Sequence, residues 1–399
     1  MIELQPTDIA HGGEAVARVD GKAHFVDGAM PGERVVGEVI KDGGTWARVE
    51  LRRVLEPAAQ RIMPPCPHFG VCGGCQWQFA DYSAQVGWKQ SILTGQLAHL
   101  GRIADPPVRP TVVVGPPFGY RNRVDLDVIE GRPAFHRRRS HALEPIDACL
   151  LLEPRLAGLF GRLGDLTGVR RVTLRVATAT GSLLAIVSGT VPDQAASWES
   201  GVAQRRRGEV RAVIGSGEIT ERVADVDFRI SADAFFQNNT PGAAALVDLV
   251  GEALSPQSGE TLLDAYAGGG LFGLTVGRGA GGVVAVESDA LAVGDLRHNS
   301  AAASVAPRVV AAPFESAQIE GRWDVAVVDP PRDGLGAAGV AAVTRGRPRA
   351  IAYVSCDPAS LARDCRSLAE KGYRLQWAAP VDLFPQTFHI ETVAAFSPG

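Results

Sequence analysis

Short runs of alternating hydrophobic and polar residues open the chain. Four such runs precede residue 57, with Asp-Gly and Pro-Gly turn signals between them, at residues 15–19, 23–26, 34–40 and 45–49. Alternation over about four to eight residues is typical of half-buried strands, and regular turns between short strands indicate a small antiparallel barrel. We therefore predict an OB-like β-barrel over residues 1–56.

The pattern is mixed between residues 57 and 232. A helical spacing of hydrophobic positions covers residues 81–100, and strand-like runs follow at 124–129, 171–177 and 183–188. Helices and strands that do not alternate regularly predict an α+β domain. The pattern leaves open whether the helix at 81–100 packs within this domain or against the C-terminal one.

From residue 233 onward, short hydrophobic strands alternate with Ala- and Leu-rich helical segments. The strands are expected at residues 261–264, 282–287, 323–329 and 350–354. This alternation predicts a parallel, doubly wound sheet, in which ligands bind at the carboxyl ends of the strands. The chain is thus predicted to be an α/β protein with three domains, at residues 1–56, 57–232 and 233–399.

Composition narrows the class of protein. With 399 residues, 46% of them hydrophobic and 21% charged, the chain is long enough for two or three soluble globular domains. It shows neither an apolar stretch of membrane-spanning length nor a signal-peptide pattern, so we expect a cytoplasmic protein without membrane contact. The net charge of −4 creates no basic field. The predicted barrel is itself acidic, with seven Lys and Arg against ten Asp and Glu.

Three clustered cysteines mark the start of the middle domain. Cys66, Cys72 and Cys75 lie within ten residues, and Cys149 is the natural fourth ligand in the same domain. A disulfide framework is not expected in a cytoplasmic chain of this size, whereas four thiolates can hold an iron–sulfur cluster or a structural zinc. Zinc sites usually consist of two Cys-x-x-Cys pairs, so a triplet with one distant cysteine favours iron–sulfur.

A glycine loop predicts a cofactor site in the C-terminal domain. Residues 264–273 follow a strand, contain G-x-G-x-x-G and open a helix, and Glu287 ends the next strand where an acid would bind ribose hydroxyls. A nicotinamide dinucleotide would fit these features. However, Asp264 before the glycines suits a cofactor that carries an amino acid and adenosine. The segment Asp329-Pro330-Pro331-Arg332 is similar to the loop of nucleic-acid methyltransferases.

Cys356 is the candidate nucleophile. It follows a hydrophobic strand directly, in the segment Val354-Ser355-Cys356-Asp357-Pro358, and so comes to the ligand-binding edge of the sheet. A thiol in this position attacks well once it is partly ionised. The competing interpretation is a buried structural cysteine.

Together these motifs resemble the S-adenosylmethionine-dependent RNA uracil-5-methyltransferases. The similarity covers essentially the whole chain and is greatest to the branch that has an N-terminal TRAM domain and a [4Fe–4S] cluster and that modifies 23S ribosomal RNA. The matching segments are the four cysteines, residues 235–239, the glycine loop, residues 329–332, residues 355–358 and residues 389–392.

The resemblance implies a role for each motif. Cys356 attacks carbon 6 of uracil, and Glu391 removes the proton from carbon 5. The cluster ligands are Cys66, Cys72, Cys75 and Cys149. The expected S-adenosylmethionine contacts are Gln237, Asp264, Tyr266, Gly268, Gly270, Glu287 and Asp329. The expected RNA contacts are Phe235, Arg121 and Arg123, with Phe236 as an alternative stacking platform.

Two features depart from the family pattern, and three alternatives stay open. Asp357 stands where the family commonly has Asn, and the barrel is acidic rather than basic. The alternatives are a transfer-RNA T-loop uridine methyltransferase, a non-catalytic RNA-binding factor, and a nicotinamide or iron–sulfur redox enzyme. We expect a monomer that binds RNA.

Overall fold

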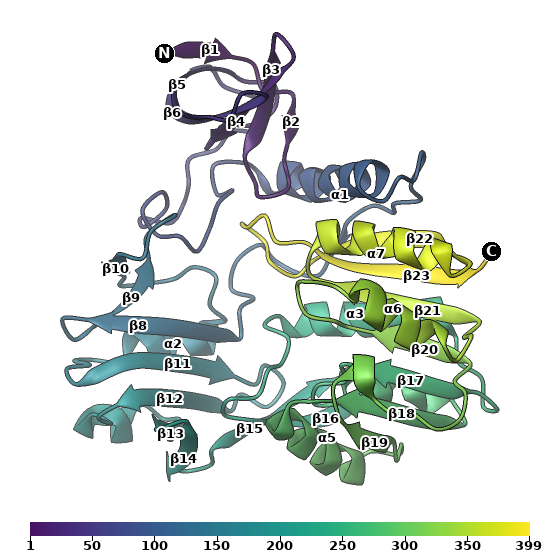
Figure 1. Cartoon of the computed structure of the whole chain (residues 1–399). Coiled ribbons are helices and arrows are strands. Elements are labelled where there is room, and N and C mark those ends of the chain that lie inside the picture. The colour runs from purple at the N-terminus through teal and green to yellow at the C-terminus, as the bar shows by residue number, and fades with distance from the viewer.

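Three large β-sheets divide the molecule, and the computed structural model describes all residues, 1–399 (Figure 1). A six-stranded sheet from the N-terminus lies at the top of the view, a seven-stranded sheet at the lower left and an eight-stranded sheet at the right. The predicted α/β class, with an OB-like barrel, a central α+β unit and a doubly wound sheet, is confirmed.

The N-terminal sheet curls around its own small core. Its strand order is β1-β5-β6-β4-β3-β2. The strands are β1 (Ile2–Leu4), β2 (Asp8–Ile9), β3 (Ala15–Val19), β4 (Lys22–Asp27), β5 (Arg34–Asp42) and β6 (Trp46–Glu56). Alternate positions such as Ala17, Val26 and Val49 are buried, as the sequence pattern predicts for a half-buried barrel strand.

The central sheet has the strand order β10-β9-β8-β11-β12-β13-β14. Its strands are β8 (Arg123–Ile129), β9 (Arg132–His136), β10 (Leu143–Pro145), β11 (Val169–Val176), β12 (Leu183–Gly189), β13 (Gly201–Arg206) and β14 (Glu209–Ile214). The helix α2 (Pro154–Gly161) packs against β11 and β12, and the short helix η1 (Asp193–Ser197) follows β12. The predicted strands at 124–129, 171–177 and 183–188 correspond to β8, β11 and β12.

The C-terminal sheet has the strand order β19-β18-β17-β20-β21-β23-β22-β7. Its strands are β7 (Val112–Val113), β17 (Thr261–Ala265), β18 (Gly282–Glu287), β19 (Arg308–Ala311), β20 (Val325–Val328), β21 (Ala350–Ser355), β22 (Tyr373–Asp382) and β23 (Glu391–Pro398). The first five strands of the order from β19 to β21 are parallel, and β23 runs antiparallel between β21 and β22. The sequence pattern did not predict the β22–β23 hairpin.

Helices cover both faces of this sheet. They are α3 (Thr240–Leu254), α4 (Leu271–Thr275), η2 (Val276–Gly279), α5 (Ala290–Ala302), η3 (Phe314–Ser316), α6 (Gly336–Thr344) and α7 (Pro358–Glu370). Successive strand residues alternate between two hydrophobic clusters: Leu262 packs with α3 and α4, whereas Leu263 packs with α6 and α7. A strand buried on both faces reads as a continuous hydrophobic run, as observed in β17, β20 and β21.

Two segments between residues 57 and 232 pack with the C-terminal sheet. The helix α1 (Tyr82–His99), whose position the sequence left open, lies against α7 and β22, and β7 pairs with β22. The hairpin β15 (Glu218–Val223) and β16 (Val226–Ser231) lies against α5. The chain therefore passes more than once between the central sheet and the C-terminal sheet.

Acidic residues of the barrel pair with arginines of the central unit. Asp27 pairs with Arg138, and Glu14 lies 2.9 Å from the Arg139 guanidinium. These pairs account for part of the barrel's acidic composition, because its carboxylates hold a neighbouring unit. They also engage two of the three consecutive arginines at residues 137–139.

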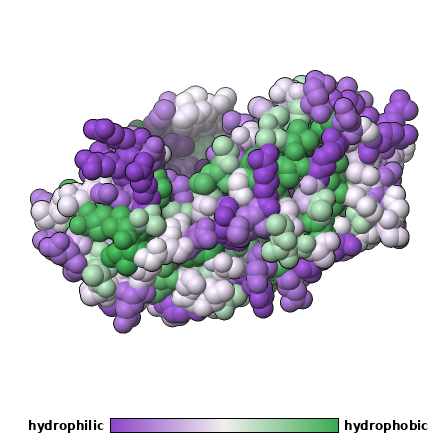
Figure 2. Space-filling model, turned by 90° about the horizontal axis from the view of Figure 1, so that it is seen from below, coloured by the Kyte–Doolittle hydropathy of each residue, from purple (hydrophilic) through white to green (hydrophobic).

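Seen from below, with the central sheet at the left and the C-terminal sheet at the right, hydrophobic areas alternate with hydrophilic side chains (Figure 2). No single hydrophobic area extends across this face. None of the helices combines the length and apolar character needed to cross a membrane.

Candidate active site

A cleft of about 1320 Å³ lies where β17, β18, β20 and β21 end, and residues of the central sheet line it as well. Pockets for a single small ligand usually measure about 300–1000 Å³, so this cleft has room for a cofactor and a nucleotide together. Most residues expected to act in catalysis or binding line it: Arg121, Arg123, Phe235, Gln237, Tyr266, Gly268, Glu287, Asp329, Cys356 and Glu391.

The glycine loop forms the floor of the cofactor side. Gly270 begins α4 with φ +97°, and a Cβ there would lie 2.7 Å from Leu296 Cδ1, so only glycine fits. Gly268 donates its backbone N–H to Glu287 Oε2 over 2.8 Å. The loop is thereby fixed to the end of β18, and its backbone lines the cleft.

Asp264 lies beneath this loop and does not line the cleft. Its side chain is fully buried, and its Oδ2 accepts the N–H of Gly273 over 2.7 Å, while Oδ1 has no partner. Burial raises the pKa of this carboxyl to about 7, and the nearby Asp329 and Glu287 act in the same direction. The sequence predicted cofactor contact for Asp264 and Gly270; neither residue lines the cleft, and their contact with the cofactor stays a prediction.

Glu287 and Tyr266 flank the loop on the cleft side. Glu287 Oε1 accepts the backbone N–H groups of Ser288 and Asp289 over 2.6 and 2.7 Å, so the carboxylate has a fixed orientation. The Tyr266 hydroxyl donates to Glu315 over 2.5 Å. Both side chains are therefore pre-oriented for a bound ligand.

Cys356 occupies the short link between β21 and α7. Asp357 is the N-cap of α7, and its Oδ1 accepts the Ser360 N–H over 2.7 Å. Burial raises the pKa of the Cys356 thiol to about 11, and the carboxyls of Glu391 and Asp329 act in the same direction. In the free protein the sulfur is thus held as a thiol.

Glu391 begins β23 on the same wall of the cleft. Burial raises its pKa well above the usual value, with a further contribution from Asp329, while Arg332 opposes the shift. Burial also raises the pKa of Asp329 to about 7. Cys356, Glu391 and Asp329 thus form a group of acids whose ionisation depends on one another.

Sequence reasoning missed Lys89, which holds the loop before Glu391. This fully buried side chain lies 2.6 Å from Asp382 Oδ1 and donates to the carbonyls of Phe384 and His389 over 3.0 and 2.8 Å. Burial lowers the pKa of His389 to about 4, with Arg332 and Lys89 acting in the same direction. A signal was present, because Lys89 stands on the same helical face as the buried Leu93.

One exposed aromatic ring lines the cleft. Phe235 is 67% exposed, whereas Phe236 is buried and packs on Phe228 at 5.6 Å between ring centroids. Only Phe235 is free to stack on a base. Arg121 and Arg123 line the same cleft, with the Arg121 Nε donating to the Arg123 carbonyl over 3.0 Å.

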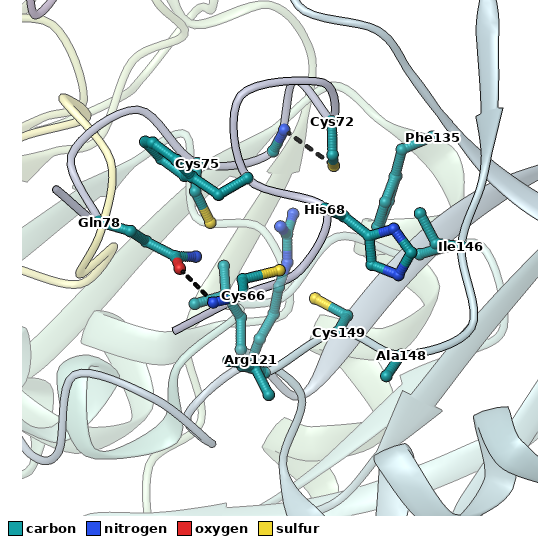
Figure 3. A pocket seen from close by; sticks show the side chains of 14 residues that line it. Cys66, His68, Cys72, Cys75, Gln78, Arg121, Phe135, Ile146, Ala148 and Cys149 are labelled. Atoms are coloured by element: carbon teal, nitrogen blue, oxygen red, sulfur yellow. Dashed lines mark hydrogen bonds between the residues drawn. The ribbon is translucent and has the colours of Figure 1, made fainter. Parts of the chain in front are cut away.

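The four clustered cysteines line one separate pocket (Figure 3). The sulfurs of Cys66, Cys72, Cys75 and Cys149 point toward a common space. Burial raises the pKa of Cys75 to about 12 and also raises those of Cys72 and Cys149. The thiols of Cys72, Cys75 and Cys149 therefore become thiolates readily only when a metal group neutralises them.

The donor set of this pocket is four cysteine side chains, which suit a metal group held by thiolates. No three of these side chains approach closely enough to ligate one metal ion, although all four enter the same space. Four thiolates could hold a [4Fe–4S] cluster or a structural zinc. Apolar neighbours, including Phe69, Phe135 and Ile146, restrict solvent access.

Comparisons with known proteins agree with the geometry. The family described as tRNA (Uracil-5-)-methyltransferase matches residues 320–397, which include Asp329, Cys356 and Glu391. An uncharacterized RNA methyltransferase of Gloeobacter violaceus is 34% identical over 97% of this chain and 94% of its own length. The 23S rRNA (uracil(1939)-C(5))-methyltransferase RlmD of Dechloromonas aromatica is 33% identical over 97% of each chain.

A solved structure shares the complete architecture. The Pyrococcus abyssi tRNA (uracil-54, C5)-methyltransferase in complex with S-adenosyl-L-homocysteine superimposes with a TM-score of 0.82 at 25% identity. The match covers 99% of this chain and 100% of that chain.

The fold and the cleft define an S-adenosylmethionine-dependent methyltransferase that acts on RNA. Full-length similarity above 30% identity then shows that this chain belongs to the RNA uracil-5-methyltransferase family. It is an enzyme that transfers a methyl group from S-adenosylmethionine to carbon 5 of uracil in RNA. The resemblance found in the sequence is confirmed, in preference to a redox enzyme or a non-catalytic factor.

Proposed function

We propose that this enzyme methylates an unpaired uridine of 23S ribosomal RNA, with Cys356 as covalent nucleophile and Glu391 as general base. The observation that carries the proposal is their placement: neighbouring strands deliver both side chains to one wall of the cleft. Carbon 5 of uracil is a weak nucleophile, and addition of a thiolate at carbon 6 gives it the electron density that it needs.

The residues act in sequence on the uracil ring. Cys356 first loses its thiol proton to solvent, a step that the charge of Arg332 favours, and the thiolate then adds to carbon 6 while the electrons of the 5,6 double bond move to form an enolate. S-adenosylmethionine, when bound, supplies the methyl group that carbon 5 takes up. The Glu391 carboxylate then removes the carbon 5 proton, the double bond re-forms and the thiolate leaves. Arg332 favours both reactions because its charge lowers the pKa of Cys356 and of Glu391.

The donor is expected on the glycine-loop side. Glu287 is suited to accept the ribose hydroxyls, and the backbone at Gly268 leaves room for the adenosine. Tyr266, Gln237 and Asp329 border the remaining volume.

The target uridine must leave any duplex to reach Cys356. Phe235 supports this proposal because an exposed ring beside the cleft can stack on a displaced base. Arg121 and Arg123 provide charges for the phosphates beside that base.

We further propose that Cys66, Cys72, Cys75 and Cys149 hold a [4Fe–4S] cluster. When bound, the cluster links the loop at 66–75 to the segment that follows β10. Iron and acid-labile sulfide measured in the purified protein test this assignment. Cys149→Ser should remove both, whereas Cys365→Ser, which alters a cysteine outside the pocket, should keep them; zinc in place of iron contradicts the proposal.

The ribosomal target rests on sequence similarity. The relatives named RlmD are 33% and 31% identical over almost the full chain. We interpret residues 1–56 as a TRAM domain, 57–232 as the cluster domain and 233–399 as the methyltransferase domain. A transfer-RNA target is the second candidate, because the similar Pyrococcus abyssi enzyme acts on tRNA. The match covers the whole length of that enzyme, so the presence of the N-terminal barrel does not distinguish a ribosomal from a transfer-RNA target.

Mapping of 5-methyluridine decides between these targets. Ribosomal and transfer RNA from a deletion strain should be digested and analysed by mass spectrometry. Loss of one 5-methyluridine from 23S RNA, restored by the wild-type chain and not by Cys356→Ala, supports the proposal. Loss from transfer RNA alone identifies the second candidate.

A further inference from the structure

A barrel histidine contacts the loop that carries the nucleophile. His11 Nε2 lies 3.1 Å from Asp357 Oδ2, although the two residues are 346 positions apart in the chain. Both side chains are partly buried, with 30% and 27% exposure. The other oxygen of Asp357 accepts the Ser360 N–H, so each carboxylate oxygen has one partner.

The loop that presents His11 is rigidly built. Ala10 N–H donates to Glu14 O over 2.8 Å, and Gly13 N–H donates back to Ala10 O over 2.9 Å. Gly13 O accepts the indole N–H of Trp77 over 3.1 Å, and a Cβ on Gly13 would lie 3.0 Å from Phe388 Cβ. His11 therefore projects from a closed turn that is fixed by neighbours on both sides.

The barrel core also continues into the catalytic wall. Ile390, the residue before Glu391, packs in the same hydrophobic cluster as barrel residues such as Val26 and Val49. The cluster includes Ile92 of α1 as well. The barrel thus contacts both segments that carry the proposed catalytic groups, one through Ile390 and one through His11.

Asp357 adds negative charge beside the Cys356 thiol, and a basic partner for Asp357 offsets that charge. Cys356 is faced by the carboxyl groups of Glu391 from β23 and of Asp329 from the loop after β20, with Arg332 as the only cation among them. Asp357 adds another carboxylate directly beside the thiol. An Asn in this position would cap α7 equally well without a charge.

The protein holds this added carboxylate in its charged form. Burial opposes the ionisation of Asp357, but hydrogen bonds from His11 and from the Ser360 backbone outweigh it and lower its pKa to about 2. The groups that face Asp357 are His11 from the barrel and Ser360 from α7. Those facing His11 include Asp357 and, farther off, His389.

We infer that His11 is a positioning residue for methyl transfer: paired with Asp357, it fixes the Cys356 loop and offsets the carboxylate beside the thiol. This inference rests on the proposed role of Cys356 as nucleophile. His11 touches neither RNA nor methyl donor in this role, and it acts through Asp357. The barrel is accordingly part of the catalytic apparatus as well as a candidate RNA-binding unit.

The test is a double-mutant cycle on the full-length holoenzyme. His11→Ala, Asp357→Asn and the double variant are treated with iodoacetamide between pH 6 and pH 9, and the rate at Cys356 is read by peptide mass spectrometry. His11→Ala should slow alkylation about two- to five-fold, as expected for one partly exposed ion pair.

In the Asp357→Asn background, the same His11→Ala change should have no effect. His11→Lys places a cation beside Asp357, so it should restore the rate. His24→Ala is the matched control, since this barrel histidine bonds to Lys22 O and lies away from Asp357. The inference is overturned if His11→Ala does not slow alkylation of Cys356, or if His24→Ala slows it to a similar extent. It is also overturned if His11→Ala slows alkylation equally with Asp357 intact and in the Asp357→Asn background.

Methylation provides a second readout. His11→Ala should lower kcat at unchanged KM for RNA, and a rise in KM alone contradicts a positioning role. Alkylation needs no RNA, so the cycle tests His11 even if the wild-type enzyme methylates no RNA offered. That latter result would contradict the proposed function by itself.

Discussion

Cys356 and Glu391 lie at one wall of the cleft because β21 and β23 are antiparallel neighbours in the sheet. The pair Ser355–Thr392 is in register, and it comes immediately before Cys356 and immediately after Glu391. Glu391 pairs with Val381 of β22, and Cys356 follows directly on the paired Ser355. The sheet thus fixes Glu391 and the point at which the short Cys356 loop begins.

Replacement of the nucleophile should abolish activity without unfolding the protein. In Cys356→Ala we expect kcat to fall at least about a thousand-fold, because no other group can activate carbon 5. Tritium transfer from labelled S-adenosylmethionine to RNA measures this loss. Cys365→Ala, a change in a buried cysteine on α7, serves as the control and should keep activity; comparable activity in both variants contradicts the assignment.

Loss of the base should trap the covalent intermediate. Glu391→Gln keeps the shape of the side chain but cannot take the carbon 5 proton, so methylated RNA should stay bound to Cys356. A denaturing gel with labelled RNA should show a slowly migrating protein–RNA band that is absent in the double variant with Cys356→Ala. Rapid turnover in Glu391→Gln without such a band would rule out this residue as the base.

The adjacent residues Phe235 and Phe236 should respond oppositely to truncation. Phe235→Ala removes an exposed ring, so we expect KM for RNA to rise about 5- to 100-fold, as for the loss of one stacked base, with unchanged Tm. Phe236→Ala empties a core position and should destabilise the fold by about 3–5 kcal/mol. Kinetics and thermal unfolding of both variants check this. Equal KM values for Phe235→Ala and the wild type would exclude stacking.

Hydrophobic periodicity predicted the strands that carry the site, but it did not predict contacts between distant segments. The strands ending near Asp264, Glu287, Asp329 and Cys356 were recognised because each is a buried run of one residue class. The direction in which the Asp264 side chain points depends on its bond to Gly273 in the glycine loop, and the hydrophobic pattern carries no information on that contact. The partners of Lys89 and His11 lie about three hundred residues away in the chain, and only the folded sheet brings them together.

Lys89 should be essential for the stability of the catalytic wall. Lys89→Met leaves the buried Asp382 without its partner, and loss of one member of a buried pair costs about 3–5 kcal/mol. The double variant Lys89→Met/Asp382→Leu should recover much of this loss, because it leaves no buried charge. Thermal unfolding of the three variants measures the recovery. A double variant no more stable than Lys89→Met would show that the contacts to the carbonyls of Phe384 and His389 dominate.

Asp264 should make the protein without bound donor less stable as the pH rises. Its folded pKa of about 7 lies above the usual carboxyl value near 4, so the folded state binds the proton more tightly than the unfolded chain. Stability from this group is therefore fully present below about pH 4, declines up to about pH 7 and is constant above. Asp329, whose pKa is also raised to about 7, contributes a decline of the same sign.

Asp264→Asn removes one of these two declines. The amide oxygen can still accept the Gly273 N–H, and the side chain stays neutral at every pH. We expect the Tm advantage of this variant over the wild type to grow by several degrees between pH 5 and pH 8, measured by calorimetry without S-adenosylmethionine. The exposed Asp248 on α3 supplies the control, because Asp248→Asn should leave the difference between pH 5 and pH 8 unchanged. An Asp264→Asn protein that loses stability with pH as steeply as the wild type would show that Asp264 is ionised in the folded protein.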